Sequence, residues 1–249
     1  DSVVELEKNL LLKNNHSVKQ LIRSNKEEIK SLTNKFSVAK NLSYSDFSKK
    51  LVDKEIRRMK PDVVHVHNFF PLWTTSIFDA CIDNDVPTVM TLHNYRTICA
   101  NGLLFRENKI CEKCLNHSAY YSVLYGCYQN SRLKSIPVAK MINHNWKKNI
   151  LNNKINRFIA LSDFAKNKFI QANFEKNKIH VKPNFIPTQI SATQTNEVRQ
   201  NHCLYIGRLS EEKGITTLLK AWENINYPLK IFGDGPLNNQ LNKSQPNIT

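Results

Sequence analysis

The 249-residue sequence has no run of about 18 uncharged apolar residues, the length that a membrane-spanning helix requires. It also has no recognisable secretory signal peptide, because its first segment, DSVVELEKNLLLKNN, carries acidic residues among the apolar ones. There is no internal repeat and no low-complexity tract. The first residue is not Met, so we expect the start of the protein to be missing. These absences exclude an integral membrane protein and favour a globular, cytoplasmic one.

Acidic residues are scarce. The chain has 36 Lys and Arg against 21 Asp and Glu, which gives a formal net charge of +15. Such an excess attracts phosphate groups, whether in nucleic acid, in anionic lipid head groups or in nucleotide substrates. A proteome that is generally rich in Lys and Asn would produce the same excess, so charge alone does not choose between these alternatives.

Apolar residues recur at two spacings. Helical spacing is present in Val3, Leu6 and Leu10, and again between Phe47 and Met59. The expected strands of the first part are VVHVHN at 63–68, PTVMTLH at 87–93, RFIALS at 157–162 and KIHVKPNF at 178–185. Strands that alternate with helices are typical of an α/β fold with a parallel sheet. Ser162 is expected to cap the helix that follows it.

A polar stretch divides the chain. Residues 186–201 lack periodicity and are interpreted as a linker between an N-terminal domain, residues 1–185, and a second domain, residues 202–249. The second domain has two expected strands, HCLYIG and LKIFGDG, around the expected helix ITTLLKAWENI. Two strands do not close a doubly wound sheet, so we expect this domain to be partial.

Polar or glycine residues end several of the expected strands. They are His67-Asn68, His93-Asn94, Ser162, Gly207-Arg208 and Gly233-Asp234-Gly235. Ligands of open parallel sheets bind at the carboxyl ends of the strands, so this shared placement predicts a binding site there.

The loop in YIGRLSEEKGI, residues 205–215, carries two cations. Gly207 lets the backbone approach a ligand closely, and Arg208 and Lys213 lie across a short loop that leads into a helix. Two cations beside a helix N-terminus suit a diphosphate. The alternative is a solvated loop whose charges are incidental. The glycine-flanked turn IFGDGPL, residues 231–237, is a weaker signal, because a tight turn forms equally well without a ligand.

The sequence resembles the family-four retaining glycosyltransferases in six motifs, which occur in the family's order. They are VVHVHN, TLHN, FIALSDFAKNKFI, VKPNFI, YIGRLSEEKGITTLLKAW and IFGDGPLNNQL. The resemblance extends from about residue 3 over nearly the whole chain. It implies a GT-B type α/β fold, in which two Rossmann-like domains face a cleft. The N-terminal domain of such enzymes receives the acceptor, and the C-terminal domain grips the sugar nucleotide.

The resemblance also implies roles for individual residues. Arg208 and Lys213 match the family's basic pair that neutralises the leaving diphosphate. His93 matches an N-domain histidine that lies near the reacting sugar. The run Gly233-Asp234-Gly235 matches a donor-domain turn near the nucleotide sugar. No catalytic metal is implied, because the usual proposal is front-face attack in which the leaving phosphate takes the acceptor proton.

Two family features are absent from the sequence. A Glu, seven residues and a second Glu should follow the donor-domain turn, and a first strand with a glycine-rich loop should precede Asp1. We therefore expect a chain truncated at both ends, and we expect it to be weak or inactive on its own.

Six cysteines are unevenly placed, and four of them fall in a segment without regular periodicity, residues 99–130. The four are Cys99, Cys111, Cys114 and Cys127. Cys-x2-Cys is a zinc-binding spacing, and four thiolates complete a tetrahedral site. Because the segment is expected to have a poor core, a structural zinc ion is the favoured interpretation, with the four sulfurs within about 4 Å of one another. A redox pair or buried thiols are the alternatives, and His117 is a possible replacement ligand.

Two further patterns leave alternatives open. His65 and His67 share one face of a strand, but no carboxylate or cysteine stands nearby in sequence, so a hydrogen-bonded or acceptor-side role is favoured over a metal pair. The segment 131–158 has apolar residues at helical spacing with Lys and Arg between them. It suits either a domain helix with a solvated basic face or contact with an anionic membrane surface.

The favoured function is a retaining hexosyltransferase that moves a sugar from a nucleotide diphosphate sugar to a saccharide or lipid-linked saccharide in surface polysaccharide synthesis. Its expected partners are the nucleotide sugar, the acceptor and an anionic surface on the inner face of the membrane, with no nucleic acid. The alternative is a basic, zinc-containing nucleic-acid-binding module. Against that alternative, the basic residues are spread along the chain and form no stripe interleaved with aromatic residues.

Overall fold

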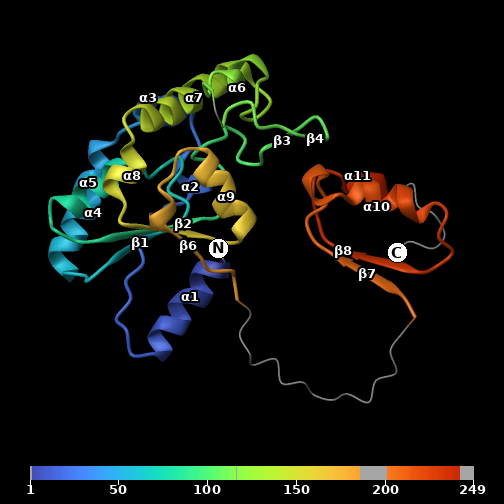
Figure 1. Cartoon of the computed structure of the whole chain (residues 1–249), viewed down its shortest axis with the longest axis horizontal. Helices are drawn as coiled ribbons and strands as arrows, with labels where there is room; N and C mark the ends of the chain where they lie inside the picture. The colour runs from blue at the N-terminus through green and yellow to red at the C-terminus, as the bar shows by residue number, and fades with distance from the viewer. Residues whose placement is uncertain (1, 116, 186–200, 242–249) are drawn as a thin grey trace. The chain divides into compact units, whose positions relative to one another are not determined.

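The structure, a computed structural model, describes residues 2–115, 117–185 and 201–241 (Figure 1). It forms two compact units, one made of residues 1–104 and 111–187 and the other of residues 105–110 and 188–249. The expected linker lies outside the described residues, except for its last residue. Among the helices in the described part, none is long and apolar enough to cross a membrane.

A four-stranded parallel sheet organises the first unit. Its strands, in spatial order, are β1 (Val64–Val66), β2 (Thr88–Leu92), β5 (Arg157–Ala160) and β6 (Ile179–Val181). Each strand lies within one of the four β-rich segments, and each is shorter than the segment that predicted it. The α/β class with a parallel sheet is therefore confirmed.

Helices precede and connect the strands of this sheet. They are α1 (Ser2–Lys13), α2 (Asn25–Glu28), α3 (Leu32–Asn41), α4 (Asp46–Met59), α5 (Ser76–Ile82), α7 (Arg132–Lys147), α8 (Ile150–Lys154), α9 (Asp163–Gln171) and the 3₁₀ turn η1 (Lys176–Lys178). Helix α4 packs against α5, and α9 packs against β5 and β6 (Figure 1). Ser162 caps α9 as predicted, since its Oγ accepts a hydrogen bond from the Ala165 N–H at 3.2 Å.

Large aromatic side chains fill the space between the sheet and these helices. Phe78 of α5, Phe158 of β5 and Phe169 of α9 are completely buried. Phe158 and Phe169 each contact the ring of Phe174 edge-on, with ring centroids 5.1 and 5.2 Å apart. Such pairs add to the stabilisation from apolar burial, so this layer fixes α9 against the strands.

The cysteine-containing segment is more ordered than its irregular pattern predicts. It contains a short antiparallel pair, β3 (Phe105–Arg106) and β4 (Lys109–Ile110), and the helix α6 (Tyr121–Leu124). Glu107 and Asn108 form the two-residue turn between the strands, both with positive φ, as a type I′ hairpin requires.

Contacts within the first unit hold the later part of this segment, from Cys111 onward. Leu115 and Ala119 are 3% and 2% exposed, so this part of the segment is better packed than the poor core that the sequence predicts. Asn143 of α7 accepts a hydrogen bond from the Ala119 N–H at 2.8 Å and donates one to Ser118 Oγ at 3.0 Å. Apolar burial and the hydrogen bonds of the buried Asn143 amide thus order this segment, a role that the sequence analysis assigned to a metal ion.

The second unit contains a separate two-stranded parallel sheet. Its elements are β7 (Cys203–Ile206), the 3₁₀ turn η2 (Glu211–Lys213), α10 (Ile215–Trp222), β8 (Leu229–Phe232) and α11 (Asn238–Leu241). Helices α10 and α11 lie on the same side of the two strands (Figure 1). Leu209, Ile215 and Leu229 are 0–2% exposed and form the small core beneath them.

Candidate active site

The carboxyl ends of the strands in the first unit bring together the histidines that follow β1 and β2. Val66 pairs with Met90 in the parallel register, so His67 and His93 leave neighbouring strands at the same edge of the sheet. His67 Nδ1 lies 2.8 Å from His93 Nε2. The predicted gathering of strand-end residues is therefore present for this pair.

A cavity of about 760 Å³ opens beside this edge of the sheet. Its lining includes His93, and its other polar side chains include Asn68, Asn94, Arg96, Asn101 and Gln129. Phe70 and Tyr128 add aromatic surface. Cavities of about 300–1,000 Å³ with aromatic walls and a few polar groups are typical of small-molecule sites, so this space is large enough for a saccharide unit.

Arg96 builds one wall of the cavity. Its guanidinium lies over the rings of Phe70 and Tyr128, 5.2 and 5.4 Å from their centroids. The two rings meet edge-on, with centroids 5.7 Å apart. The backbone N–H of Arg96 donates to Asn94 Oδ1 at 2.9 Å, and Asn94 Nδ2 donates to Asn68 Oδ1 at 3.2 Å. This stacked and hydrogen-bonded arrangement positions the amide groups before any ligand arrives.

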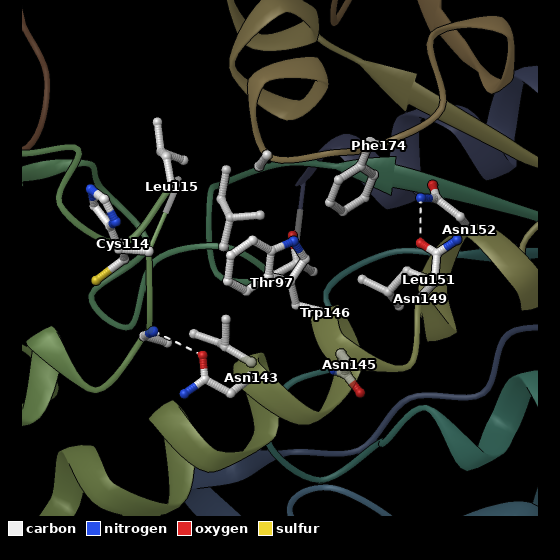
Figure 2. A pocket seen from close by; sticks show the side chains of 15 residues that line it. Thr97, Cys114, Leu115, Asn143, Asn145, Trp146, Asn149, Leu151, Asn152 and Phe174 are labelled. Atoms are coloured by element: carbon white, nitrogen blue, oxygen red, sulfur yellow. Dashed lines mark hydrogen bonds between the residues drawn. The ribbon is translucent and has the colours of Figure 1, made fainter.

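A second cavity, shown in Figure 2, is much smaller. It has a volume of about 30 Å³, close to that of one water molecule, and lies among Trp146, Leu151 and Phe174. Cys114 and Leu115 approach it from the cysteine-containing segment. The space is too small for a sugar, so the cavity beside His93 is the candidate site.

The histidines at the sheet edge are held in their neutral form. Burial lowers the pKa of His93 below its usual value, against the opposing effect of the Glu7 carboxylate. Burial, together with neighbouring His65, lowers the pKa of His67 to about 4. Near neutral pH these imidazoles carry no charge, so they act as hydrogen-bond donors and acceptors rather than as cations.

Glu7 is a site residue that the sequence analysis missed. It lies on α1, and its Oε2 is 3.3 Å from His67 Nε2, while its Oε1 pairs with Lys182 Nζ at 2.5 Å. Burial opposes the charge on Glu7, but the hydrogen bond and charge of Lys182 lower its pKa overall. Glu7 and His67 are 60 residues apart, and no local pattern links them.

The predicted cation pair of the second unit lies on one exposed loop. Arg208 follows β7 and Lys213 ends η2, and the Tyr205 hydroxyl donates to the Arg208 carbonyl oxygen at 3.1 Å. Burial raises the pKa of Glu212, but a hydrogen bond from Ser210 Oγ and the charges of Arg208 and Lys213 lower it overall. Both cations therefore lie close enough to Glu212 to act on the same carboxylate.

The glycines of this unit have a structural role that their motif did not reveal. A Cβ on Gly233 would lie 1.9 Å from the Gly207 carbonyl oxygen, and one on Gly235 would lie 2.3 Å from that of Leu209. The Leu209 N–H also donates to the Asp234 carbonyl oxygen at 3.0 Å. The turn at 233–235 thus packs directly against the loop that carries Arg208. Whether Gly207, Asp234 and these glycines contact a nucleotide sugar stays a prediction.

The four cysteines of the irregular segment share a neighbourhood but do not form a tetrahedral set. Burial raises the pKa of the Cys114 thiol to about 12, and the other three cysteines contribute to the increase. All four are described, and no three of their sulfurs lie within 4.8 Å of one another. The expected convergence within about 4 Å is wrong. Zinc binding by Cys99, Cys111, Cys114 and Cys127 stays a prediction without support from the geometry.

Comparison with known proteins identifies the enzyme class to which these features correspond. The family model Glycosyltransferase Family 4 matches residues 23–190, which is more than half of the chain. The chain belongs to this glycosyltransferase family. No curated protein matches it.

Three solved structures are similar to parts of the chain. Anabaena HepE in complex with UDP is 20% identical, with 77% of this chain and 45% of that one covered and a TM-score of 0.44. HepE with UDP and glucose is 17% identical, with 87% and 58% covered and a TM-score of 0.47. UDP-N-acetylglucosamine 2-epimerase from Rickettsia bellii is 11% identical, with 83% and 52% covered and a TM-score of 0.37. The chain therefore spans about half the length of these proteins.

Proposed function

We propose that this chain is part of a retaining glycosyltransferase that moves a sugar from a nucleotide diphosphate sugar to a saccharide or lipid-linked saccharide acceptor. Membership of Glycosyltransferase Family 4 supports the reaction class. The observation that carries the assignment to residues is the loop of the second unit, on which Arg208, just after β7, and Lys213, at the end of η2, are both exposed. A diphosphate placed beside this loop would meet two cations at once.

The chemistry follows from where charge develops. As the bond between the anomeric carbon and the diphosphate breaks, negative charge grows on the departing phosphate oxygens. Arg208 and Lys213, both on the exposed loop between β7 and α10, would stabilise that charge. No step in this scheme requires a metal ion, because the two side chains supply the compensating charge.

The acceptor is assigned to the cavity of the first unit. Amide groups fixed by hydrogen bonds suit the hydroxyl groups of a sugar, and the ring of Tyr128 offers an apolar face beside them. His93 lines the same cavity and is neutral near pH 7, so it can exchange hydrogen bonds with a sugar hydroxyl without adding charge. These features support the predicted place of His93 near the reacting sugar.

The experiment that tests the proposal measures sugar transfer by the full-length enzyme with single alanine replacements. Arg208→Ala and Lys213→Ala should each lower kcat at least tenfold, because removing one preorganised charge partner costs roughly 3 kcal/mol in the transition state. Arg157→Ala is the matched control, since Arg157 is exposed at the start of β5, at the amino end of that strand. Near-normal turnover in both loop variants contradicts the assignment.

An anionic membrane surface is proposed as the place where a lipid-linked acceptor is met. Exposed apolar side chains crowd α6 and the start of α7, and Leu124 and Leu133 are 61% and 79% exposed. Arg132 and Lys134 flank Leu133, a pattern suited to an interface with anionic lipid. Sedimentation with phosphatidylglycerol vesicles tests this proposal. The wild-type chain should bind these vesicles, and Leu133→Glu should bind them more weakly. Neither protein should bind vesicles of phosphatidylcholine, which carries no net charge.

A further inference from the structure

Three potential metal ligands meet between α1 and β1. Glu7 Oε2 lies 3.3 Å from His67 Nε2 and 4.0 Å from His65 Nδ1, and the three ligand atoms all lie within 4.8 Å of one another. Within the described residues, this is the single group of three or more His, Cys, Asp or Glu side chains with that spacing. Tetrahedral bonds of about 2.0–2.1 Å place neighbouring ligand atoms about 3.3 Å apart, so the group is close to a binding geometry already.

The far nitrogen of each imidazole already has a partner. His65 Nε2 lies 2.8 Å from Thr91 Oγ1, and His67 Nδ1 lies 2.8 Å from His93 Nε2. When each of these nitrogens donates its hydrogen outward, the lone pairs of His65 Nδ1 and His67 Nε2 face Glu7. Metal-binding histidines are held in this way, because a hydrogen bond on the far nitrogen fixes both the ring and its tautomer.

One oxygen of the carboxylate between them lacks a donor. Glu7 is 9% exposed, and its Oε2 is buried without a hydrogen-bond partner, whereas its Oε1 is paired with Lys182. An ionised oxygen in this position carries a desolvation cost that a hydrogen bond would normally offset. A cation among Glu7 Oε2 and the two lone pairs would satisfy all three groups. Burial also keeps both imidazoles neutral, which is their metal-binding form.

We propose that Glu7, His65 and His67 bind one zinc ion. Two imidazole nitrogens and one carboxylate oxygen suit zinc, with a water molecule as fourth ligand, better than they suit calcium or magnesium, which prefer oxygen ligands. The ion ties α1 to the carboxyl end of β1 across 57 intervening residues. It also fixes His67 Nδ1–H as the donor to His93, and so sets the tautomer of a residue that lines the larger cavity.

The test uses the tag-free chain, stripped of metal with a chelator and titrated with zinc chloride by calorimetry. We expect one zinc ion per chain and a higher melting temperature with zinc. Glu7→Gln and His65→Gln should each weaken zinc binding at least tenfold and abolish the zinc-dependent rise in melting temperature. His180→Gln is the matched control, because His180 is an exposed histidine on β6 that takes no part in the group.

Two measurements keep the result decisive. X-ray absorption of the zinc-loaded wild-type chain should show a nitrogen and oxygen shell at about 2.0–2.1 Å and no sulfur at about 2.3 Å, which tests the proposal even if a variant fails to fold. Replacing zinc with cobalt distinguishes this site from the four cysteines, because only thiolate ligands give an intense sulfur-to-cobalt absorption band. Absence of zinc binding, equal binding by Glu7→Gln, or a sulfur shell overturns the proposal.

Discussion

Gly233 and Gly207 touch through their backbones so closely that a single added carbon has no room. A Cβ on Gly233 would lie 1.9 Å from the Gly207 carbonyl oxygen, a separation that real Cβ atoms essentially never show. The atom it meets is backbone that follows β7, not the end of a flexible side chain. The turn after β8 and the loop that carries Arg208 therefore act as one packed element.

This contact predicts that Gly233→Ala destabilises the second unit. The added methyl group must push the two loops apart, and overpacking of this kind costs about 1–3 kcal/mol. Hydrogen exchange of the β7 and β8 amides measures the loss of local stability directly. Gly207→Ala is the matched control, because the three atoms nearest to its Cβ all belong to the Tyr205 side chain, the hydroxyl oxygen at 3.2 Å first, and this side chain can shift, so protection should change little.

Ser162, which follows the carboxyl end of β5 in the first unit, offers a second stability test. Its Oγ accepts from the Ala165 N–H, so Ser162→Ala should lower the free energy of unfolding by about 1 kcal/mol. Ser24 precedes α2 but makes no capping hydrogen bond with its side chain. Ser24→Ala should therefore leave the urea midpoint unchanged, and an equal loss in both variants would contradict the capping role.

Local patterns predicted the elements of the fold well, and the reason is physical. The four β-rich segments and the cap at Ser162 depend on residues next to one another in sequence, where propensity and hydrogen bonding act directly. The parallel sheet followed from the alternation of strands with helices. His93 followed from its place after β2, and it does line the larger cavity.

The sequence did not reveal the contacts that tertiary structure creates. Glu7 contacts His67 only because the fold places α1 beside the end of β1. The contact of Gly233 with Gly207 depends on β7 and β8 lying side by side. The spacing of Cys111 and Cys114 suggested a metal, yet Leu115 and Asn143 order that segment by burial and hydrogen bonding. Identical spacing in sequence is compatible with either arrangement, so spacing alone could not decide.

Thiol reactivity tests the surroundings of the cysteines. Burial raises the pKa of Cys81 and of Cys114 to about 12, so at pH 8 each has about a thousandfold less thiolate than an ordinary thiol of pKa 9. Cys203 is exposed. Iodoacetamide followed by mass spectrometry should label Cys203 first and the other two at least a hundredfold more slowly. A chelator that exposes Cys114 to labelling would instead support a metal at the cysteines.

The cavity beside His93 leads to a prediction about the acceptor. Gln129 lines this cavity, and its amide is exposed and contacts Tyr128 only through a long hydrogen bond of 3.4 Å. Gln129→Ala removes one or two hydrogen bonds to a bound saccharide without disturbing the core. Neutral hydrogen bonds contribute about 0.5–1.5 kcal/mol each, so KM for the acceptor should rise about three- to tenfold, with KM for the nucleotide sugar unchanged.

The matched control for this prediction is Gln171→Ala. Gln171 ends α9, where its side chain accepts a hydrogen bond from Lys168 at the surface, and it does not line the cavity. Initial rates of the full-length enzyme are measured over a range of acceptor concentrations at saturating donor, and over a range of donor concentrations at saturating acceptor, which gives KM for each substrate. If Gln129→Ala raises KM for the donor instead, the cavity binds the nucleotide sugar rather than the acceptor, because a hydrogen bond lost to one substrate weakens that substrate alone.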